Sequence, residues 1–254
     1  MCTTLGAISD VSVEQASEGA VEVSINGEPR EAEVTRSAVE CLTAGRHLRV
    51  TVETALELPE SQGFGMSAAG ALSTSVALAN LLGIDRQKAF EAAHRAELDC
   101  GAGLGDVPAL HRAGITIRDI PGLPPVGRVQ RIEEEPDVLL ATVGPPMKTS
   151  QILDDAESVA RINRSGGRKV DRLLAEPTLS NLMRLSSEFA VETGLAQGRV
   201  LEAVRASERA GKTSMVMLGN SVFAIGRTEE LTSILRDFGE VRHCGVDNVG
   251  PRLL

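Results

Sequence analysis

The chain has 254 residues, of which 42% are hydrophobic and 24% are charged, and this composition is typical of a folded globular protein with one large core or two adjoining ones. Only 2% of the residues are aromatic and Trp and Tyr are absent, which argues against a stacking platform for single-stranded nucleic acid. The net charge of -9 and the lack of a basic run argue against any nucleic-acid partner, so an anionic ligand must be bound by backbone N–H groups, a metal ion and a few cations.

Alternating apolar and polar residues predict that the chain begins with strands. The stretches AISDVSVEQA and AVEVSING both alternate in this way, and Asn26-Gly27 is a pair suited to the positive φ angles of a tight turn. A short helix is expected over residues 37–43, and it ends before Gly45. The next stretch, HLRVTVETALELP, alternates again and predicts a strand that stops at Pro59.

A glycine-rich loop and two helices are predicted next. The loop, PESQGFGMSAAG, covers residues 59–70 and runs into SAAGALSTSVALANLLG, whose small and apolar residues predict a buried helix that ends near Gly83. Asp85 is suited to be the N-cap of a second helix, DRQKAFEAAHRAEL, which breaks at the glycines of CGAGLGDVPAL. A short strand, GITIRDI, and a proline-rich turn, PGLPP, follow.

The second half of the chain is predicted to be mainly helical. It begins with a strand over residues 138–143 and contains TSMVMLGNSVFAIG before a last strand near residues 240–246. The pattern is α+β in two closely joined lobes, with domains predicted at residues 1–140 and 141–254. Helices are expected around residues 152–174, 179–194, 199–210 and 229–238.

The glycine loop fits two well-known motifs only in part. Gly63, Gly65 and Ala68 match the dinucleotide-binding pattern G-x-G-x-x-A, but no buried strand runs directly into the loop, as that motif requires. Ser67 stands where a nucleophile elbow places its serine, but the glycine that should follow two residues later is an alanine. Both interpretations are therefore disfavoured.

The same loop is better suited to hold an anion. Glycines let the backbone approach a phosphate closely, and a helix that begins near Ser67 points its free N–H groups and the positive end of its dipole at the same place. The Ser67 hydroxyl can also ligate Mg²⁺. The alternative is a tight strand-to-helix turn in which Ser67 is only an N-cap.

Three segments resemble the motifs of the GHMP kinases, the superfamily of galactokinase, homoserine kinase and mevalonate kinase. PESQGFGMSAAGALS is similar to the motif P-x-x-x-G-x-G-S-S-A, HRAELDCGAGLGDVPAL to the segment with a metal-binding Glu followed by Gly-x-Gly-Asp, and TSMVMLGNSVFAIG to the third motif. Together the three segments span residues 59–226. In the motif P-x-x-x-G-x-G-S-S-A, Met66 replaces the usual first serine, and the other positions are occupied by Pro59, Gly63, Gly65, Ser67 and Ala68.

Within this superfamily, five segments are similar to those of the archaeal pantoate kinases: SQGFGMSAAGALS, AELDCGAGLGDV, GITIRDIPG, GPPMKTSQIL and SMVMLGNSVFAIG. The resemblance implies a two-lobed α+β GHMP kinase fold, with a β-rich N-terminal lobe that carries the glycine-loop helix and a C-terminal α/β lobe. It also implies an ATP-dependent kinase that uses Mg²⁺ and phosphorylates the 4-hydroxyl of pantoate in archaeal coenzyme A biosynthesis. Mevalonate, phosphomevalonate and homoserine are the alternative substrates.

The resemblance assigns roles to residues of PESQGFGMSAAGALS and HRAELDCGAGLGDVPAL. Ser67 and Glu97 would supply the few protein oxygens that Mg²⁺ takes beside phosphates and waters. Asp106 would orient the attacking hydroxyl and accept its proton, since phosphoryl transfer depends mainly on positioning and electrostatics. The alternatives are that Asp106 is an N-cap of VPAL and that Glu97 is a solvated helix residue. The ATP phosphates are expected to be bound by Gly63, Gly65, Met66, Ser67 and Ala68.

Two further side chains are candidates for contact with the substrate. His94 lies three residues before Glu97 on the predicted helix and shares its face, so it either contacts the substrate or makes a structural hydrogen bond. Arg118 ends the apolar run GITI, and its guanidinium suits the carboxylate of pantoate. The alternative for Arg118 is a surface ion pair with Asp119 or with a nearby acid. Lys148 is a weaker second cation.

One departure from the resemblance concerns the start of the chain. GHMP kinases begin with a Pro- and Gly-rich first motif, and pantoate kinases resemble one another in a P-G-H element and a G-S-x-G-A-G turn. The opening MCTTLGAISDVSV contains neither, so we expect a leading strand and one wall of the substrate pocket to be absent and a sheet edge to be uncovered. A non-catalytic nucleotide-binding protein is therefore a competing hypothesis, and a homodimer stays open.

No targeting or membrane segment is predicted. The opening MCTTLGAISD has no basic n-region, and no apolar stretch reaches the ~20 residues of a membrane span, so no membrane partner is expected. Cys2, Cys41, Cys100 and Cys244 lie too far apart for a zinc knuckle or a redox pair, and we expect buried, reduced thiols. The expected location is the cytoplasm.

Overall fold

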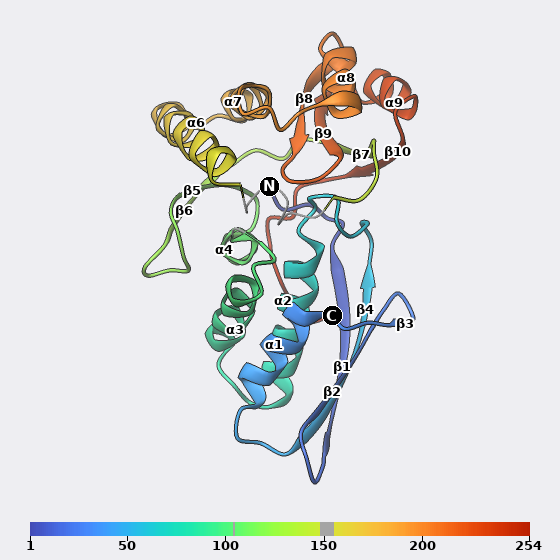
Figure 1. Cartoon of the computed structure of the whole chain (residues 1–254), viewed down its shortest axis with the longest axis vertical. Coiled ribbons are helices and arrows are strands. Elements are labelled where there is room, and N and C mark those ends of the chain that lie inside the picture. The colour runs from blue at the N-terminus through green and yellow to red at the C-terminus, as the bar shows by residue number, and fades with distance from the viewer. Residues whose placement is uncertain (104, 148–154) are drawn as a thin grey trace.

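The computed structural model describes residues 1–103, 105–147 and 155–254. Two four-stranded sheets dominate it, one built from the start of the chain and one from its second half, and each is packed against helices (Figure 1). The predicted α+β class is confirmed. The predicted domain boundary near residue 140 stays a prediction, and the first strand of the second sheet begins at Val138.

The first sheet has the strand order β1-β4-β2-β3, with β1 antiparallel and β2 parallel to β4. Leu48, Val50 and Val52 of β4 are all buried and pack with apolar residues of the helices, as their alternation predicted. Asn26 and Gly27 have the positive φ angles expected of a tight turn. The strands are β1 (Ala7–Gln15), β2 (Ala20–Ile25), β3 (Glu28–Pro29) and β4 (Leu48–Leu56).

Helices cover one face of this sheet (Figure 1). The first begins at Glu33 rather than at residue 37, because Val34 packs into the core beside Ala38. Asp85 caps the third helix as predicted, since its side chain accepts a hydrogen bond from the amide of Gln87 at 2.7 Å. The helices are α1 (Glu33–Thr43), α2 (Met66–Leu81), α3 (Arg86–Asp99) and α4 (Asp106–Arg112).

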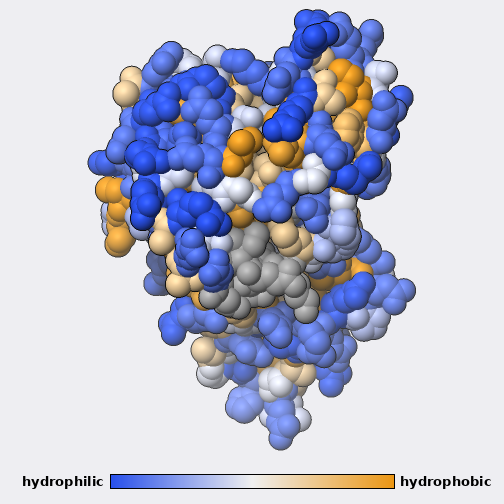
Figure 2. Space-filling view, turned by 45° about the horizontal axis from the view of Figure 1, so that its top comes forward, coloured by the Kyte–Doolittle hydropathy of each residue, from blue (hydrophilic) through white to orange (hydrophobic). Residues whose placement is uncertain are grey.

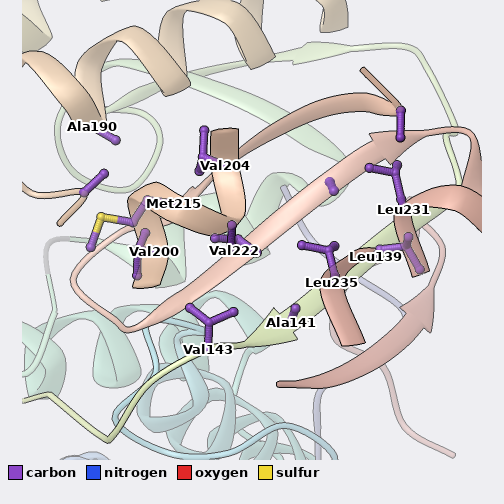
Figure 3. Packing of buried hydrophobic residues seen from close by; sticks show 14 residues of the cluster. Leu139, Ala141, Val143, Ala190, Val200, Val204, Met215, Val222, Leu231 and Leu235 are labelled. Atoms are coloured by element: carbon purple, nitrogen blue, oxygen red, sulfur yellow. The ribbon is translucent and has the colours of Figure 1, made fainter. Parts of the chain in front are cut away.

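The second sheet is antiparallel throughout, in the order β10-β7-β9-β8. The segment TSMVMLGNSVFAIG forms its β8–β9 hairpin. Leu139, Val222, Leu231 and Leu235 belong to the hydrophobic cluster between this sheet and its helices (Figure 3). The elements are β7 (Val138–Thr142), α6 (Ala156–Ala175), α7 (Leu179–Glu192), α8 (Gly198–Ser207), β8 (Gly211–Val216), β9 (Ser221–Gly226), α9 (Thr228–Arg236) and β10 (Glu240–Cys244).

A strand that the sequence did not predict lies beside GITIRDI. The predicted strand, β5 (Ile115–Ile120), pairs antiparallel with β6 (Arg128–Ile132), whose sequence RVQRI places only Ile132 in a buried position. The polar residues of β6 hid it from the hydrophobic pattern. The buried isoleucines of this pair pack against Leu173 of α6 and Met183 of α7, so the hairpin joins the core of the second half.

The end of the chain returns from the second sheet to the first half. Gly114 donates a backbone hydrogen bond to the carbonyl of Asp247 at 2.8 Å, and the amide of Asp247 donates one to the carbonyl of Cys2 at 3.0 Å. The guanidinium of Arg86 on α3 contacts the carbonyl of Pro251. Both ends of the chain therefore help to join the two halves (Figure 1).

The remaining expectations concern membrane segments and the burial of the four cysteines. None of the helices in the described part of the chain combines the length and the apolar composition that a membrane crossing needs. The face seen in Figure 2 is mostly hydrophilic, with hydrophobic residues in small groups. All four cysteines are free thiols. The expectation of burial is wrong for Cys41, which is exposed, and holds for Cys2.

Candidate active site

A cavity of about 1130 Å³ lies between the two halves of the molecule. Its walls come from β1, the glycine loop, α2 and α4 on one side, and from β7, α6, α7 and β8 on the other. Gly63, Gly65, Met66 and Asp106, all of them predicted site residues, are among the lining residues. The cavity therefore connects the predicted phosphate loop with the predicted catalytic carboxylate.

The glycine loop leads directly into α2. Gly63 and Gly65 have φ angles of 82° and 69°, in the left-handed region that glycine adopts without strain. Gly65 is the N-cap of α2, and Ser67 is the exposed second residue of the helix, so the alternative in which Ser67 is the N-cap is wrong. Gly65 has no side chain with which to cap the helix, so within the described residues its first N–H groups are available to an anion.

Asp106 lies beside this loop, at the start of α4. A Cβ atom placed on Gly65 would come within 3.1 Å of Oδ2 of Asp106, so the carboxylate packs against the loop where a side chain is missing. Gly105 is the N-cap of α4 and Asp106 is the first residue of the helix, so the alternative in which Asp106 is the N-cap is wrong. The Asp106 amide donates a hydrogen bond to Oε1 of Glu97 at 3.0 Å.

The surroundings of Asp106 raise its pKa to about 6. Desolvation has the largest effect, the carboxylate of Glu97 raises the pKa further, and the guanidinium of Arg118 lowers it. Asp106 is enclosed by protein groups yet remains accessible to water in the cavity, so solvent screens part of this effect. A carboxylate with a raised pKa accepts a proton more readily than an ordinary Asp, which suits a general base.

Arg118 reaches the start of α4 from β5. Its Nη1 donates a hydrogen bond to the carbonyl oxygen of Gly105 at 2.6 Å, and its charge acts on the neighbouring Asp106. The alternative of an ion pair with Asp119 is wrong, because Asp119 pairs with Arg128 of β6, at 2.7 Å between Oδ2 and Nε. The candidate Lys148 lies outside the described residues.

Glu97 is buried at 1% exposure, so it is not the solvated helix residue of the alternative interpretation. Nδ1 of His94 lies 3.6 Å from Oε2 of Glu97, and within the described residues neither atom has a hydrogen-bond partner. Glu97 accepts a hydrogen bond from the amide of Asp106, and neither Glu97 nor His94 is among the residues described as lining the cavity. A buried carboxylate oxygen without a partner is unfavourable by itself, and it fits a cation that binds together with the nucleotide.

The described residues contain no group of three or more His, Cys, Asp or Glu side chains arranged to hold a metal ion. Mg²⁺ that binds together with a nucleotide takes most of its ligands from phosphates and waters, so the protein needs to supply only one or two oxygens. The exposed hydroxyl of Ser67 and the unpartnered Oε2 of Glu97 are oxygens of this kind.

Sequence reasoning missed how the glycine loop is held. Gln62, the residue before Gly63, is buried at 3% exposure and makes hydrogen bonds to the second half of the molecule. A polar residue directly before the first glycine was the only signal in the sequence. Its partners come from strands that are distant in the chain, so the pattern alone could not identify the contact.

Comparison with known proteins identifies relatives over most of the chain. Residues 33–114 match the family model of the GHMP kinases N terminal domain.

A pantoate kinase of Thermococcus kodakarensis is 36% identical over 217 residues, which cover 83% of this chain and 72% of the relative. A pantoate kinase of Methanospirillum hungatei is 32% identical over 231 residues, which cover 90% of this chain and 76% of the relative. A solved structure, described as a phosphotransferase related to the CoA biosynthesis pathway, is 31% identical with a TM-score of 0.88, and the match covers 98% of this chain and 86% of that one.

Proposed function

The chain belongs to the pantoate kinase family of the GHMP kinases, and we propose that it transfers the γ-phosphoryl group of ATP to the 4-hydroxyl of pantoate. The product, 4-phosphopantoate, would serve coenzyme A biosynthesis. The observation that carries the proposal is the meeting of two motifs at one cavity: the glycine loop before α2 and the carboxylate of Asp106 lie against each other there. The proposed substrate, pantoate, is taken from the relatives, which are named pantoate kinases.

ATP use follows from membership in a kinase family, and the glycine loop is the proposed phosphate site. Gly63 and Gly65 leave room for phosphate oxygens to approach the backbone, while the N–H groups of Met66, Ser67 and Ala68 point out of the helix end. Neutral N–H groups suit this protein, whose net charge of -9 offers no general attraction for a nucleotide. Mg²⁺, held by Ser67 and Glu97, would neutralise charge on the phosphates when bound.

Asp106 is the proposed general base. The oxygen of the 4-hydroxyl forms a bond to the γ-phosphorus, the bond between that phosphorus and the bridging oxygen of ADP breaks, and the hydroxyl proton passes to the Asp106 carboxylate. Arg118 lies close enough to lower the pKa of Asp106, and its positive charge is the proposed attraction for the carboxylate of pantoate. His94, which lies behind Glu97, is proposed to support the substrate side of the site through that carboxylate.

The test is ATP-dependent phosphorylation measured by mass spectrometry with pantoate, mevalonate, phosphomevalonate and homoserine as separate substrates. We expect phosphopantoate from the purified chain with ATP and Mg²⁺, and no product from the other three. Turnover of one of those three and not of pantoate would keep the kinase and overturn the substrate. ATP binding without any transfer would support the competing hypothesis of a non-catalytic nucleotide-binding protein.

A further inference from the structure

One side chain joins the glycine loop to the second sheet. Gln62 is 3% exposed although it belongs to a loop. Its Nε2 donates a hydrogen bond to the carbonyl oxygen of Gly144 at 3.0 Å, and its Oε1 accepts one from the hydroxyl of Ser221 at 3.1 Å. Gly144 follows β7 and Ser221 begins β9, so a single amide group is bound to two neighbouring strands of the other half.

The backbone around Gln62 fits closely against the β8–β9 turn. A Cβ atom placed on Gly63 would come within 2.5 Å of the carbonyl oxygen of Met217, and one placed on Gly219 would overlap the backbone of Gln62. The amide of Met147 donates a hydrogen bond to the carbonyl of Ser61 at 2.9 Å. The loop is therefore shaped by the second half of the molecule as much as by its own sequence.

These contacts with the second half matter because the glycine loop alone would not keep a single backbone conformation. Ser61, Gly63 and Gly65 all have positive φ angles, and glycines have many accessible backbone conformations when nothing holds them. A loop that must be ordered by its ligand loses binding free energy in the ordering, whereas a loop that is already ordered does not.

We propose that Gln62 is a positioning residue that holds the phosphate loop in its binding conformation by anchoring it to β7 and β9, and thereby sets the affinity for ATP. This inference rests on the proposed function of the loop. Gln62 itself is not among the described lining residues of the cavity, so it acts through the backbone of Gly63 and the residues that follow. The hairpin of TSMVMLGNSVFAIG thus contributes to the nucleotide site from the other half.

The test measures the affinity for ATP separately from turnover. It uses Gln62→Met, Ser221→Ala and the two combined, together with a control variant. Gln62→Met keeps the length of the side chain and removes both hydrogen bonds, and we expect it to raise the Kd for ATP, measured by calorimetry, about tenfold, which corresponds to ~1.4 kcal/mol. The KM for pantoate should change less than twofold. Ser221→Ala, which leaves the bond to Gly144 in place, should raise the Kd for ATP about threefold and should have no further effect in the Gln62→Met background.

Ser207→Ala is the matched control, since it removes the buried hydrogen bond between Ser207 and Thr213 of the same half, which measures 2.7 Å and lies away from the loop. We expect this control to lower the Tm without changing the Kd for ATP. If Gln62→Met and Ser221→Ala lower the Tm as the control does and leave the Kd for ATP unchanged, the role of Gln62 is structural only and the inference is overturned. Failure of the unmodified chain to bind ATP would overturn the proposed function of the loop together with this inference.

Discussion

Asp106 is a residue whose ionised form is unfavourable for the folded protein. Its pKa is raised from 3.8 to about 6, so the native state holds the proton more tightly than the unfolded chain does. The stability that the protonated Asp106 gives to the folded protein is therefore fully present below the unfolded pKa of 3.8. It is lost as the pH rises through the folded pKa of about 6. A shift of this size in a fully buried group corresponds to ~3 kcal/mol, and screening by water in the cavity reduces it to about 1 kcal/mol.

Replacing Asp106 with Asn should raise the stability of the folded protein and lower its catalytic rate. We expect the unliganded Asp106→Asn protein, in EDTA, to be about 1 kcal/mol more stable than the unmodified chain at neutral pH and to lose less stability as the pH rises from about 4 to about 6.5. We also expect kcat to fall at least 100-fold, because the substitution removes the proposed general base. Denaturant unfolding across this pH range and phosphopantoate formation give the two measurements.

Asp85→Asn is the matched control, because Asp85 is the N-cap of another helix, α3, and its side chain accepts a hydrogen bond from the amide of Gln87. It should leave kcat unchanged. Equal pH dependence of stability in Asp106→Asn and the unmodified chain, together with retained turnover, would contradict the role given to Asp106.

At the scale of single residues, the sequence predicted that Asp106 and the glycines of the loop belong to one site, and the structure places Asp106 against Gly65. These residues could be chosen because each motif is local, and their roles stay predictions. The hydrogen bond from Arg118 to Gly105 and the pair between Asp119 and Arg128 could not, because they depend on how β5 lies against α4 and on β6.

The backbone of the glycine loop is closely constrained, and at Gly63 glycine is required for two separate reasons. Gly63 has a φ of 82°, and a side chain there would meet the backbone of Met217 in the other half. Gly27 has a φ of 83° with open space around it. The two positions therefore share a left-handed backbone, which would strain any other residue, and differ in how closely another part of the chain approaches them.

We expect Gly27→Ala to lower the free energy of unfolding by about 1 kcal/mol, the strain of a left-handed alanine. Gly63→Ala should lower it by about 3 kcal/mol, because the added methyl must displace the backbone of the β8–β9 turn, and it should weaken ATP binding at least tenfold. Chemical denaturation and calorimetry of both variants test this. Equal losses of stability, with ATP binding intact in both, would show that the contact between loop and hairpin is dispensable.

The elements that the sequence predicted well are those with a strong apolar pattern and a clear end signal. β4 and α2 have both, and the N-cap Asp85 fixed the start of α3. β6 was missed because its sequence RVQRI is largely polar, and α1 was predicted too short because the pattern at its start is weak. The pairing of β2 parallel to β4 needs a crossover through α1, which local patterns do not reveal.

At the scale of the whole molecule, the site belongs to neither half alone. The cavity takes its walls from both halves, and Gln62 and the returning C-terminal segment tie them together. The sequence predicted a two-lobed α+β protein and the GHMP kinase fold, and the structural likeness with a TM-score of 0.88 confirms that fold. The contacts by which the second half holds the glycine loop were not predictable, since they depend on packing between residues far apart in the chain.

The central claim is that this molecule phosphorylates pantoate at its 4-hydroxyl, and phosphorus NMR of a completed reaction tests it most directly. With the chain, ATP, Mg²⁺ and pantoate, we expect equal formation of ADP and of a new phosphomonoester whose phosphorus is split into a triplet by the two protons of the adjoining methylene group. A doublet, which reports the single proton beside the 2-hydroxyl, would place the phosphate on the wrong oxygen. ADP formed together with inorganic phosphate and no ester would contradict the kinase assignment itself.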